Sequence, residues 1–225
     1  GVTITDQNGC QVSSSITLTQ PPVLNQNISA FTYASGSNIS CFGLSNGSID
    51  LTVFGGNPSY GYSWNTGATT QDISGLPAGT YSVTVTDLNG CTVNANITLV
   101  EPTQLNGGLV PSIYAGGVNV SGCVDDGTID LTVNGGSPIY TYLWSNGSTS
   151  QDLSGLAAGN YSVTVTDLNG CQTTQNITLT EPTPLSQSIS AFVYPSGTNI
   201  SCFGLSDGNI DLTIGGGTPG YNYLW

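Results

Sequence analysis

The stretch YSVTVTDLNGC stands at Tyr81–Cys91 and again, without a change, at Tyr161–Cys171. Other landmarks recur with the same spacing of 80 or 81 residues. A proline follows a glycine pair at Pro58, Pro138 and Pro219, and a tryptophan closes a Tyr-x-Tyr-x-Trp run at Trp64, Trp144 and Trp225. A fixed period of this length indicates a string of similar small domains rather than one large core.

The period divides the chain into two complete units, 21–100 and 101–180, flanked by two partial ones. Residues 1–20 correspond to the last strands of a unit, and residues 181–225 correspond to the first strands of one. We expect the segment to belong to a much longer repeat protein. The alternative is that half-units of neighbouring molecules complete one another by strand addition, which would give a head-to-tail polymer. The short joints favour a stiff rod.

Alternation of apolar and polar residues dominates each unit. In the segment 48–53, Ile49, Leu51 and Val53 alternate with polar residues, which predicts a half-buried strand. Asn89-Gly90, between two such runs, is typical of a tight hairpin. About seven short strands fit into each unit, so the fold class is all-β: tandem immunoglobulin-like sandwiches of about 80 residues, stacked end to end.

Aromatic residues support this fold. Trp64 falls on the strand where an immunoglobulin-type sandwich buries an aromatic side chain. The pattern Leu-x-Ala-Gly-x-Tyr, which ends at Tyr81 and again at Tyr161, is typical of a tyrosine corner. We therefore predict that these aromatic residues belong to the core and the corner rather than to a carbohydrate-binding platform.

Basic residues are absent from the chain. Its 225 residues contain no Lys, Arg or His and 13 acidic residues, a formal net charge of −13. No cation is available to neutralise a phosphate, so nucleic acid and anionic membrane surfaces are excluded as partners, and no membrane insertion is expected. The chain also lacks the His and Lys of acid–base catalysis and any phosphate-binding glycine loop, so we expect neither an enzyme nor a bound cofactor.

The run GGSPIYTYLWSNGSTSQDLSGLAAGNYSVTVTDLNGC, Gly135–Cys171, resembles the SprB repeat and is similar, more distantly, to the PKD type of immunoglobulin-like domain. The match recurs in every unit and covers nearly the whole chain. The resemblance implies a giant cell-surface protein of gliding or adhesive bacteria related to the Bacteroidota, exported by a dedicated secretion system. It implies no active site.

Each unit carries two cysteines, one before its second strand and one at the hairpin turn. These are Cys41, Cys123 and Cys202, and Cys10, Cys91 and Cys171. An even number at regular spacing, in a chain that reads as extracellular, predicts disulfides rather than reactive thiols. Zinc is not expected, because the chain has no His and no Cys-x-x-Cys pair.

The sandwich topology limits the pairing. The two cysteines of one unit are expected at its opposite ends, farther apart than a disulfide can span. If units stack end to end, the first cysteine of one unit meets the hairpin cysteine of the next. We therefore favour Cys41 with Cys171, the other cysteines pairing outside this segment. The alternative is consecutive pairing, Cys91 with Cys123 and Cys10 with Cys41.

Two kinds of modification or ligand site are predicted. Asp125, Asp126 and Asp130 form the best calcium candidate, because carboxylate oxygens are the ligands that this ion prefers. Eight Asn-x-Ser/Thr sequons are candidates for covalent glycans, at Asn27, Asn38, Asn46, Asn96, Asn119, Asn146, Asn176 and Asn199. Strand parity points Asn96 and Asn176 outward.

These observations predict a structural or adhesive extracellular filament on a bacterial surface, whose partners are further copies or further repeats of the same chain. The alternative is the stalk of an adhesin that binds a surface or glycan ligand through a head outside this segment.

Overall fold

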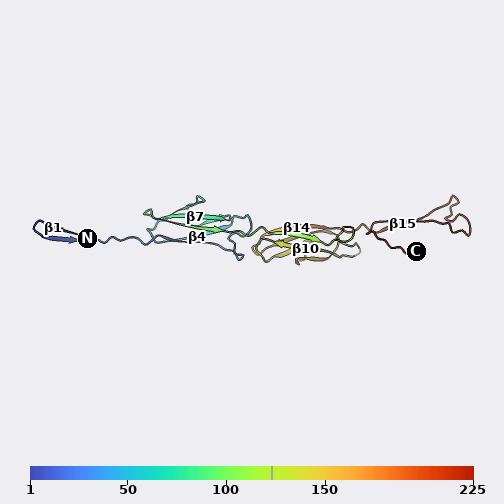
Figure 1. The fold of residues 1–225 in the computed structure, drawn as a ribbon, viewed down its shortest axis with the longest axis horizontal. Helices are drawn as coiled ribbons and strands as arrows, with labels where there is room; N and C mark the ends of the chain where they lie inside the picture. Colours follow the sequence, from blue (N-terminus) through green and yellow to red (C-terminus); the bar gives the residue numbers. More distant parts are fainter. Residues whose placement is uncertain (123) are drawn as a thin grey trace. The chain divides into compact units, whose positions relative to one another are not determined.

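The computed structural model describes residues 1–122 and 124–225 and contains only strands, turns and loops over these residues (Figure 1). None of the described residues forms a helix that could cross a bilayer. The chain divides into two compact units, Gly1–Pro102 and Thr103–Trp225. Each unit holds one complete sandwich and part of a further repeat.

In the first unit a hairpin precedes the sandwich. The hairpin strands are β1 (Val2–Thr5) and β2 (Gln11–Ser14). The sandwich strands are β3 (Asn25–Ala30), β4 (Gly47–Phe54), β5 (Gly61–Trp64), β6 (Ile73–Leu76), β7 (Gly79–Thr86) and β8 (Thr92–Leu99). They form two antiparallel sheets, in the orders β3-β4-β6 and β5-β7-β8.

The second unit repeats this sandwich and adds a further strand pair. Its sandwich strands are β9 (Asn106–Pro111), β10 (Gly127–Asn134), β11 (Thr141–Trp144), β12 (Leu153–Leu156), β13 (Gly159–Thr166) and β14 (Gln172–Leu179). The sheet orders are β12-β10-β9 and β11-β13-β14. The extra pair is β15 (Ser186–Ala191) with β16 (Ile210–Gly215). The all-β prediction and the assignment to immunoglobulin-like sandwiches are confirmed.

Among the described residues each sandwich has six strands, one fewer than the seven or so expected. β4 is the central strand of its sheet, and two side chains just before β6 bind its backbone where β6 no longer pairs with it. Asp72 Oδ1 accepts the N–H of Leu51 at 2.9 Å, and Gln71 Nε2 donates to the carbonyl of Leu51 at 2.6 Å. The equivalent contacts recur on β10, where Asp152 and Gln151 bind Leu131. These side chains therefore satisfy the backbone groups of the central strand beyond the end of its short neighbour.

The core lies between the two sheets, as the alternation predicts. Trp64 is buried, and its Nε1 donates to the carbonyl of Thr70 at 2.9 Å. The tyrosine corner is confirmed: Tyr81 Oη donates to the carbonyl of Pro77 at 2.8 Å, and Tyr161 Oη donates to that of Ala157 at 3.1 Å. The other buried apolar residues of the first core are Ile39, Ile49, Leu51, Ile73, Leu76, Val83, Val85, Ala95 and Leu99.

One turn holds a residue in an unfavourable conformation. Ile139 has φ of 91°, in the left-handed region that β-branched side chains avoid. Its counterpart in the first unit is Ser59, with φ of 96°, and in the partial repeat at 181–225 it is Gly220, with φ of 112°. The turn therefore keeps the same backbone whether or not glycine occupies it.

We expect Ile139→Gly to stabilise the second sandwich by about 1 kcal/mol, because relief of strain exceeds the entropy cost of glycine. Little burial is lost, since Ile139 is exposed. Urea unfolding measures the change. Leu143→Gly is the control: this residue is also exposed but lies on β11, so the same substitution should destabilise. A loss of stability in Ile139→Gly would contradict the strain.

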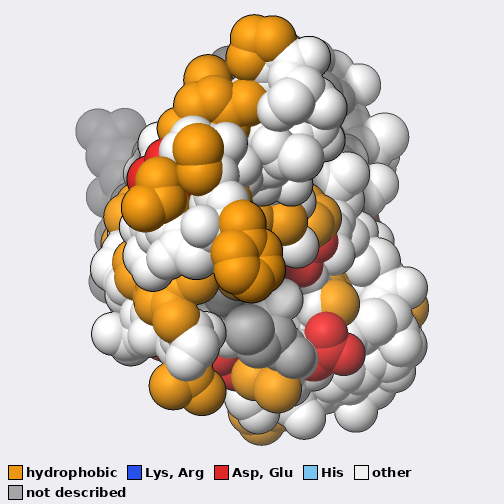
Figure 2. Space-filling view, turned by 90° about the vertical axis from the view of Figure 1, so that its right-hand side faces the viewer, with side chains coloured by type: hydrophobic (Ala, Val, Ile, Leu, Met, Phe, Trp, Pro, Cys, Tyr) orange, Lys and Arg blue, Asp and Glu red, His pale blue; other side chains and the backbone are white. Residues whose placement is uncertain are grey.

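The partial repeats expose the faces that the complete sandwiches bury. Apolar side chains of β1, β2 and β15 are exposed along their strands, as is Ile210 of β16. Figure 2, a space-filling view, shows exposed hydrophobic side chains, some acidic ones and no basic ones.

Candidate functional site

The first candidate site is the hairpin turn between β7 and β8, which is built on one carboxylate. Asp87 Oδ1 accepts the N–H groups of Asn89 and Cys91 at 3.0 and 2.9 Å. Its Oδ2 accepts the N–H of Asn57, which follows the glycine pair, at 2.9 Å. Asp87 is buried, and these three backbone donors satisfy its charge. The turn is thereby fixed with Cys91 exposed at its tip.

The same turn recurs in each repeat. Asp167 Oδ1 accepts the N–H groups of Asn169 and Cys171, and its Oδ2 accepts the N–H of Ser137 at 2.8 Å. In the β1–β2 hairpin, Asp6 Oδ1 makes the two turn contacts, to Asn8 and Cys10, each at 2.8 Å. In all three hairpins the carboxylate thus caps amides of its own turn.

These bonds set the charge state of the turn. The N–H of Asn57 contributes most to holding the pKa of the Asp87 carboxyl below its ordinary value of 3.8, with Cys91 and Asn89 adding to it and burial opposing it. The carboxylate therefore stays ionised at any neutral or mildly acidic pH.

We expect the first sandwich to lose stability as the pH falls below about 4, through the lowered folded-state pKa of Asp87. The folded pKa lies below the unfolded one, so the stabilisation is complete above the unfolded value and disappears at lower pH. Urea unfolding at decreasing pH measures this loss. Asp87→Asn should be less stable at neutral pH and less sensitive to acid. Parallel pH curves for the two proteins would contradict this role of Asp87.

The second candidate site is the loop before β4, which presents Cys41. Its anchor is Asn38, which we call the asparagine latch. Asn38 N–H donates to the carbonyl of Val100 at 2.8 Å, while its Oδ1 accepts the N–H of Val100 at 3.0 Å. Its Nδ2 donates to the carbonyl of Phe31 at 3.0 Å. These bonds hold the loop that carries Cys41 at the end of the sandwich where Val100 follows β8.

The latch recurs in the second sandwich and in the partial repeat. Asn119 is buried: its Oδ1 accepts the N–H of Thr180 at 3.1 Å, and its Nδ2 donates to the carbonyl of Ser112 at 2.8 Å. Asn199 Nδ2 donates to the carbonyl of Phe192 at 2.9 Å. The sequence assigned these three asparagines to glycan sites. The three asparagines occupy the same position of the repeat, and in the sequence this recurrence was the signal for a structural role.

A further side chain forms hydrogen bonds within the same loop. Asn46 Oδ1 accepts the N–H of Ser40 at 3.2 Å, and its Nδ2 donates to Ser40 Oγ at 2.7 Å. In the second sandwich Asp126 takes this place, accepting the N–H of Ser121 at 2.9 Å. That N–H is the main reason why the pKa of Asp126 lies below its ordinary value.

The calcium candidates do not form a ligand set. Asp126 binds backbone within its own loop, and Asp130 is exposed on β10, which lies at the centre of its sheet. Among residues 1–122 and 124–225, no three acidic or cysteine side chains gather as a metal site would require. Asp125, Asp126 and Asp130 therefore remain a prediction that no arrangement of the described residues supports.

The cysteines differ in state. Cys41 and Cys171 are disulfide-bonded. Cys10, Cys91 and Cys202 are exposed free thiols in this chain, and Cys123 lies outside the described residues. Consecutive pairing is therefore wrong for this structure, because it would oxidise Cys10 and Cys91.

The candidate glycosylation sites separate by whether their Nδ2 atom donates a hydrogen bond. Asn27, Asn96, Asn146 and Asn176 are exposed, as strand parity predicted for Asn96 and Asn176. The Nδ2 atoms of Asn38, Asn119, Asn199 and Asn46 instead donate hydrogen bonds within their loops. A glycan replaces one hydrogen of this nitrogen and would crowd these contacts.

We therefore expect intact-mass and peptide analysis of native material to place any N-linked glycan on Asn27, Asn96, Asn146 or Asn176. Asn119 serves as the internal control, because its sequon is complete but its side chain is buried. A glycan on Asn119 would contradict the latch.

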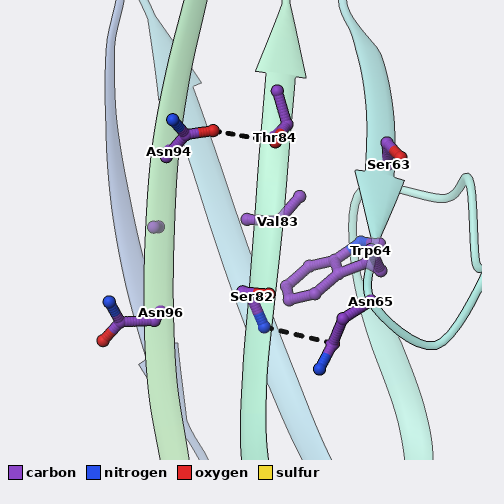
Figure 3. A pocket seen from close by; sticks show the side chains of 9 residues that line it. Ser63, Trp64, Asn65, Ser82, Val83, Thr84, Asn94 and Asn96 are labelled. Atoms are coloured by element: carbon purple, nitrogen blue, oxygen red, sulfur yellow. Dashed lines mark hydrogen bonds between the residues drawn. The ribbon is translucent and has the colours of Figure 1, made fainter.

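A shallow hollow of about 430 Å³ lies on the outer face of the β5-β7-β8 sheet. Figure 3 shows Asn94 and Thr84 hydrogen-bonded across β8 and β7, and Ser82 and Asn65 hydrogen-bonded nearby. None of the nine lining residues is titratable. The hollow also contains the sequon residue Asn96, so it suits neutral hydrogen bonding or an attached glycan rather than acid–base chemistry.

The sandwiches with a repeated Asp-anchored turn and asparagine latch define a tandem immunoglobulin-like repeat chain. The SprB repeat profile matches residues 34–69, 118–149 and 196–225, one segment in each repeat with a latch. The chain therefore contains SprB repeats, which are found in bacterial surface proteins.

Solved structures give weaker likenesses. The C-terminal 282-residue fragment of intimin, in complex with the intimin-binding domain of the translocated intimin receptor, is 15% identical, covers 79% of this chain and 68% of that chain, and has a TM-score of 0.35. Murine CEACAM1b is 14% identical, covers 61% of this chain and 94% of that chain, and has a TM-score of 0.27. No curated protein matches the chain.

Proposed function

We propose that the chain is a structural and adhesive filament on a bacterial surface, in which disulfides join successive sandwiches. The observation that carries this proposal is the state of the cysteines. Cys41, before β4, and Cys171, after β13, are disulfide-bonded, while Cys91, in the hairpin of the first sandwich, is free. A disulfide within a single sandwich would oxidise both of its own cysteines, which the free thiol of Cys91 rules out for the first unit.

The pairing we propose is Cys41 with Cys171. Within the first unit, the latch ties the loop of Cys41 to Val100, at the end where the chain leaves the sandwich. Within the second unit, Asp167 ties the turn of Cys171 to Ser137, next to Gly136, whose N–H donates to the carbonyl of Thr103. Each cysteine thus lies at the end of its own unit nearest to the two residues that join Val100 to Thr103.

This pairing gives a rule for the whole chain: the cysteine before the second strand of one repeat bonds the hairpin cysteine of the next. A covalent bond across each joint limits how far two sandwiches can separate or rotate under tension. We propose that Cys10, Cys91 and Cys202 find partners by the same rule in further repeats or in other copies.

A structural role also suits the surface chemistry. Each carboxylate without a cation must be solvated or bound to backbone donors, and Asp87 and Asp167 are satisfied in that way. The remaining negative charge keeps molecules apart and soluble outside the cell. We propose no catalytic role, and we assign any adhesive contact to neutral polar faces such as the β5-β7-β8 hollow, through surface or glycan ligands.

Electron microscopy of native material tests the filament. The proposal predicts ordered fibres with a regular repeat along their axis, which lose order when a reductant opens the joints. Isolated flexible stalks that carry a distinct head would instead support the second candidate, an adhesin stalk with its binding head outside this segment.

A further inference from the structure

We infer that Gln71 and Asp72 form a side-chain plug that closes the open side of strand β4 to a strand from a second copy of this chain. The second sandwich carries the same plug on β10, where Gln151 and Asp152 bind Leu131. We call each pair an edge plug. The inference does not depend on the filament proposal, because it concerns what keeps complete sandwiches of different molecules from joining side by side.

The stretch that the edge plug closes lies beyond the end of β6. β6 pairs with β4 only as far as Ile49, whereas β4 continues to Phe54. On its other side β4 pairs with β3 from Ile49 to Phe54. Backbone groups of an antiparallel strand point alternately to its two sides, so Leu51 and Val53 turn their N–H and C=O groups away from β3. A row of such groups is a template for a further strand.

The edge plug supplies the bonds that a further strand would make. Asp72 Oδ1 lies 2.9 Å from the backbone nitrogen of Leu51, and Gln71 Nε2 lies 2.6 Å from its carbonyl oxygen. A residue of an added antiparallel strand would likewise accept the N–H of Leu51 and donate to its C=O. The two side chains therefore occupy this pairing position with one acceptor and one donor. At Leu131 the two distances are 2.9 and 2.7 Å.

The opposite sheet holds the edge plug in this orientation. Tyr62, on β5, donates from its Oη to Gln71 Oε1 at 3.0 Å, so the amide nitrogen is left to face β4. In the second sandwich Tyr142, on β11, donates in the same way to Gln151 Oε1 at 3.2 Å. The plug is thus fixed from both sheets, and the segment before β6 is held against β4.

The edge plug lies at the surface rather than in the core. Gln71 and Asp72 are exposed, whereas the next residue, Ile73, is buried. Water can satisfy backbone groups at an exposed position, so hydrogen bonding alone does not require side chains there. Exclusion of other strands explains why both sandwiches nevertheless carry the same pair.

The composition of the chain limits the other means of protecting this edge. Lysine and proline commonly protect sheet edges in proteins, but this chain has no Lys, and β4 and β10 contain no Pro. The occupant that the plug excludes is a second copy, because every copy presents the same stretch of β4. Two such stretches can pair antiparallel about a two-fold axis, so each opened sandwich supplies one edge.

Hydrogen exchange of the Leu51 amide, followed by NMR of the whole chain with a reductant present, tests the plug. In dilute solution, Gln71→Ala combined with Asp72→Ala should speed this exchange by about tenfold or more, because the amide loses its acceptor. At high concentration the amide should regain protection from an added strand. Sedimentation velocity should then show a dimer beyond any association of the natural chain. Adding Gln151→Ala and Asp152→Ala, which opens the second sandwich, should give assemblies larger than a dimer.

Two controls separate opening of the edge from other effects. Asp72→Asn keeps an acceptor oxygen and leaves Gln71 in place, so it should behave like the natural chain. Val85→Ala makes a cavity in the core of the same sandwich with the plug intact, so it measures association caused by lost stability alone. An opened chain that gains no dimer over the natural chain, or that associates no more than Val85→Ala, would overturn the inference.

The second sandwich makes the test independent of how well the first tolerates substitution. If the first sandwich unfolds when its plug is removed, Gln151→Ala with Asp152→Ala repeats the experiment on β10. If both pairs prove necessary for folding, the plug is a structural element and the inference falls. No variant alters a cysteine, so the covalent joints are judged separately.

Discussion

Gly135→Ala is expected to destabilise the second sandwich by about 3 kcal/mol or more, the largest effect of any small substitution in this chain. The backbone φ is +73°, and an added Cβ would lie 1.9 Å from the carbonyl oxygen of Gln104. Gln104 lies in the segment that leads into the sandwich. Neither Gln104 nor Gly135 can therefore move without disrupting the loop in which Ser137 donates to Asp167. The contact recurs at Gly55, 2.0 Å from the carbonyl of Val23.

Gly147→Ala separates the two causes of this effect. Its φ is +85°, but an added Cβ meets no atom within 4 Å. We expect only the conformational cost there, about 1 to 2 kcal/mol. Urea unfolding followed by circular dichroism measures both. Equal losses for the two variants would show that backbone conformation alone, and not the close approach to Gln104, makes Gly135 necessary.

Trp144→Ala is expected to destabilise the second sandwich by about 3 to 5 kcal/mol. The side chain is among the largest that are fully buried, and its Nε1 donates to the carbonyl of Ser150 at 2.8 Å. Truncation leaves a cavity between the sheets and an unpaired carbonyl at the turn.

Unfolding in urea, followed by circular dichroism, measures the loss. Trp144→Phe keeps most of the volume and should cost less, while Leu143→Ala, on the exposed side of the same strand, should cost little. A small effect of Trp144→Ala would contradict the assignment of this tryptophan to the core.

The strands, their hairpin turns and the core were readable from the sequence because each depends on local chemistry. Alternation places Ile49 and Leu51 inward, Asn89-Gly90 closes the hairpin between β7 and β8, and the Tyr81 corner needs only a carbonyl four residues away. The turn aspartates follow the same logic, since two of their acceptor contacts lie within four residues.

The features that escaped prediction depend on partners far away in sequence. The latch joins Asn38 to Val100, 62 residues apart, and a sequon gives no hint of that contact. One strand fewer than expected forms in each sandwich, and Gln71 and Asp72 use side chains to satisfy the backbone of β4 beyond the end of β6. The acids at 125–130 looked like an ion site, yet Asp126 was needed for its own loop.

The most direct test of the account is a peptide map of the native protein, digested without reduction and with free thiols blocked beforehand. The account predicts a cross-linked peptide pair that contains Cys41 and Cys171, both of which are bonded in the structure. A map in which Cys41 is joined to Cys91 of its own sandwich would contradict the covalent joint between successive repeats.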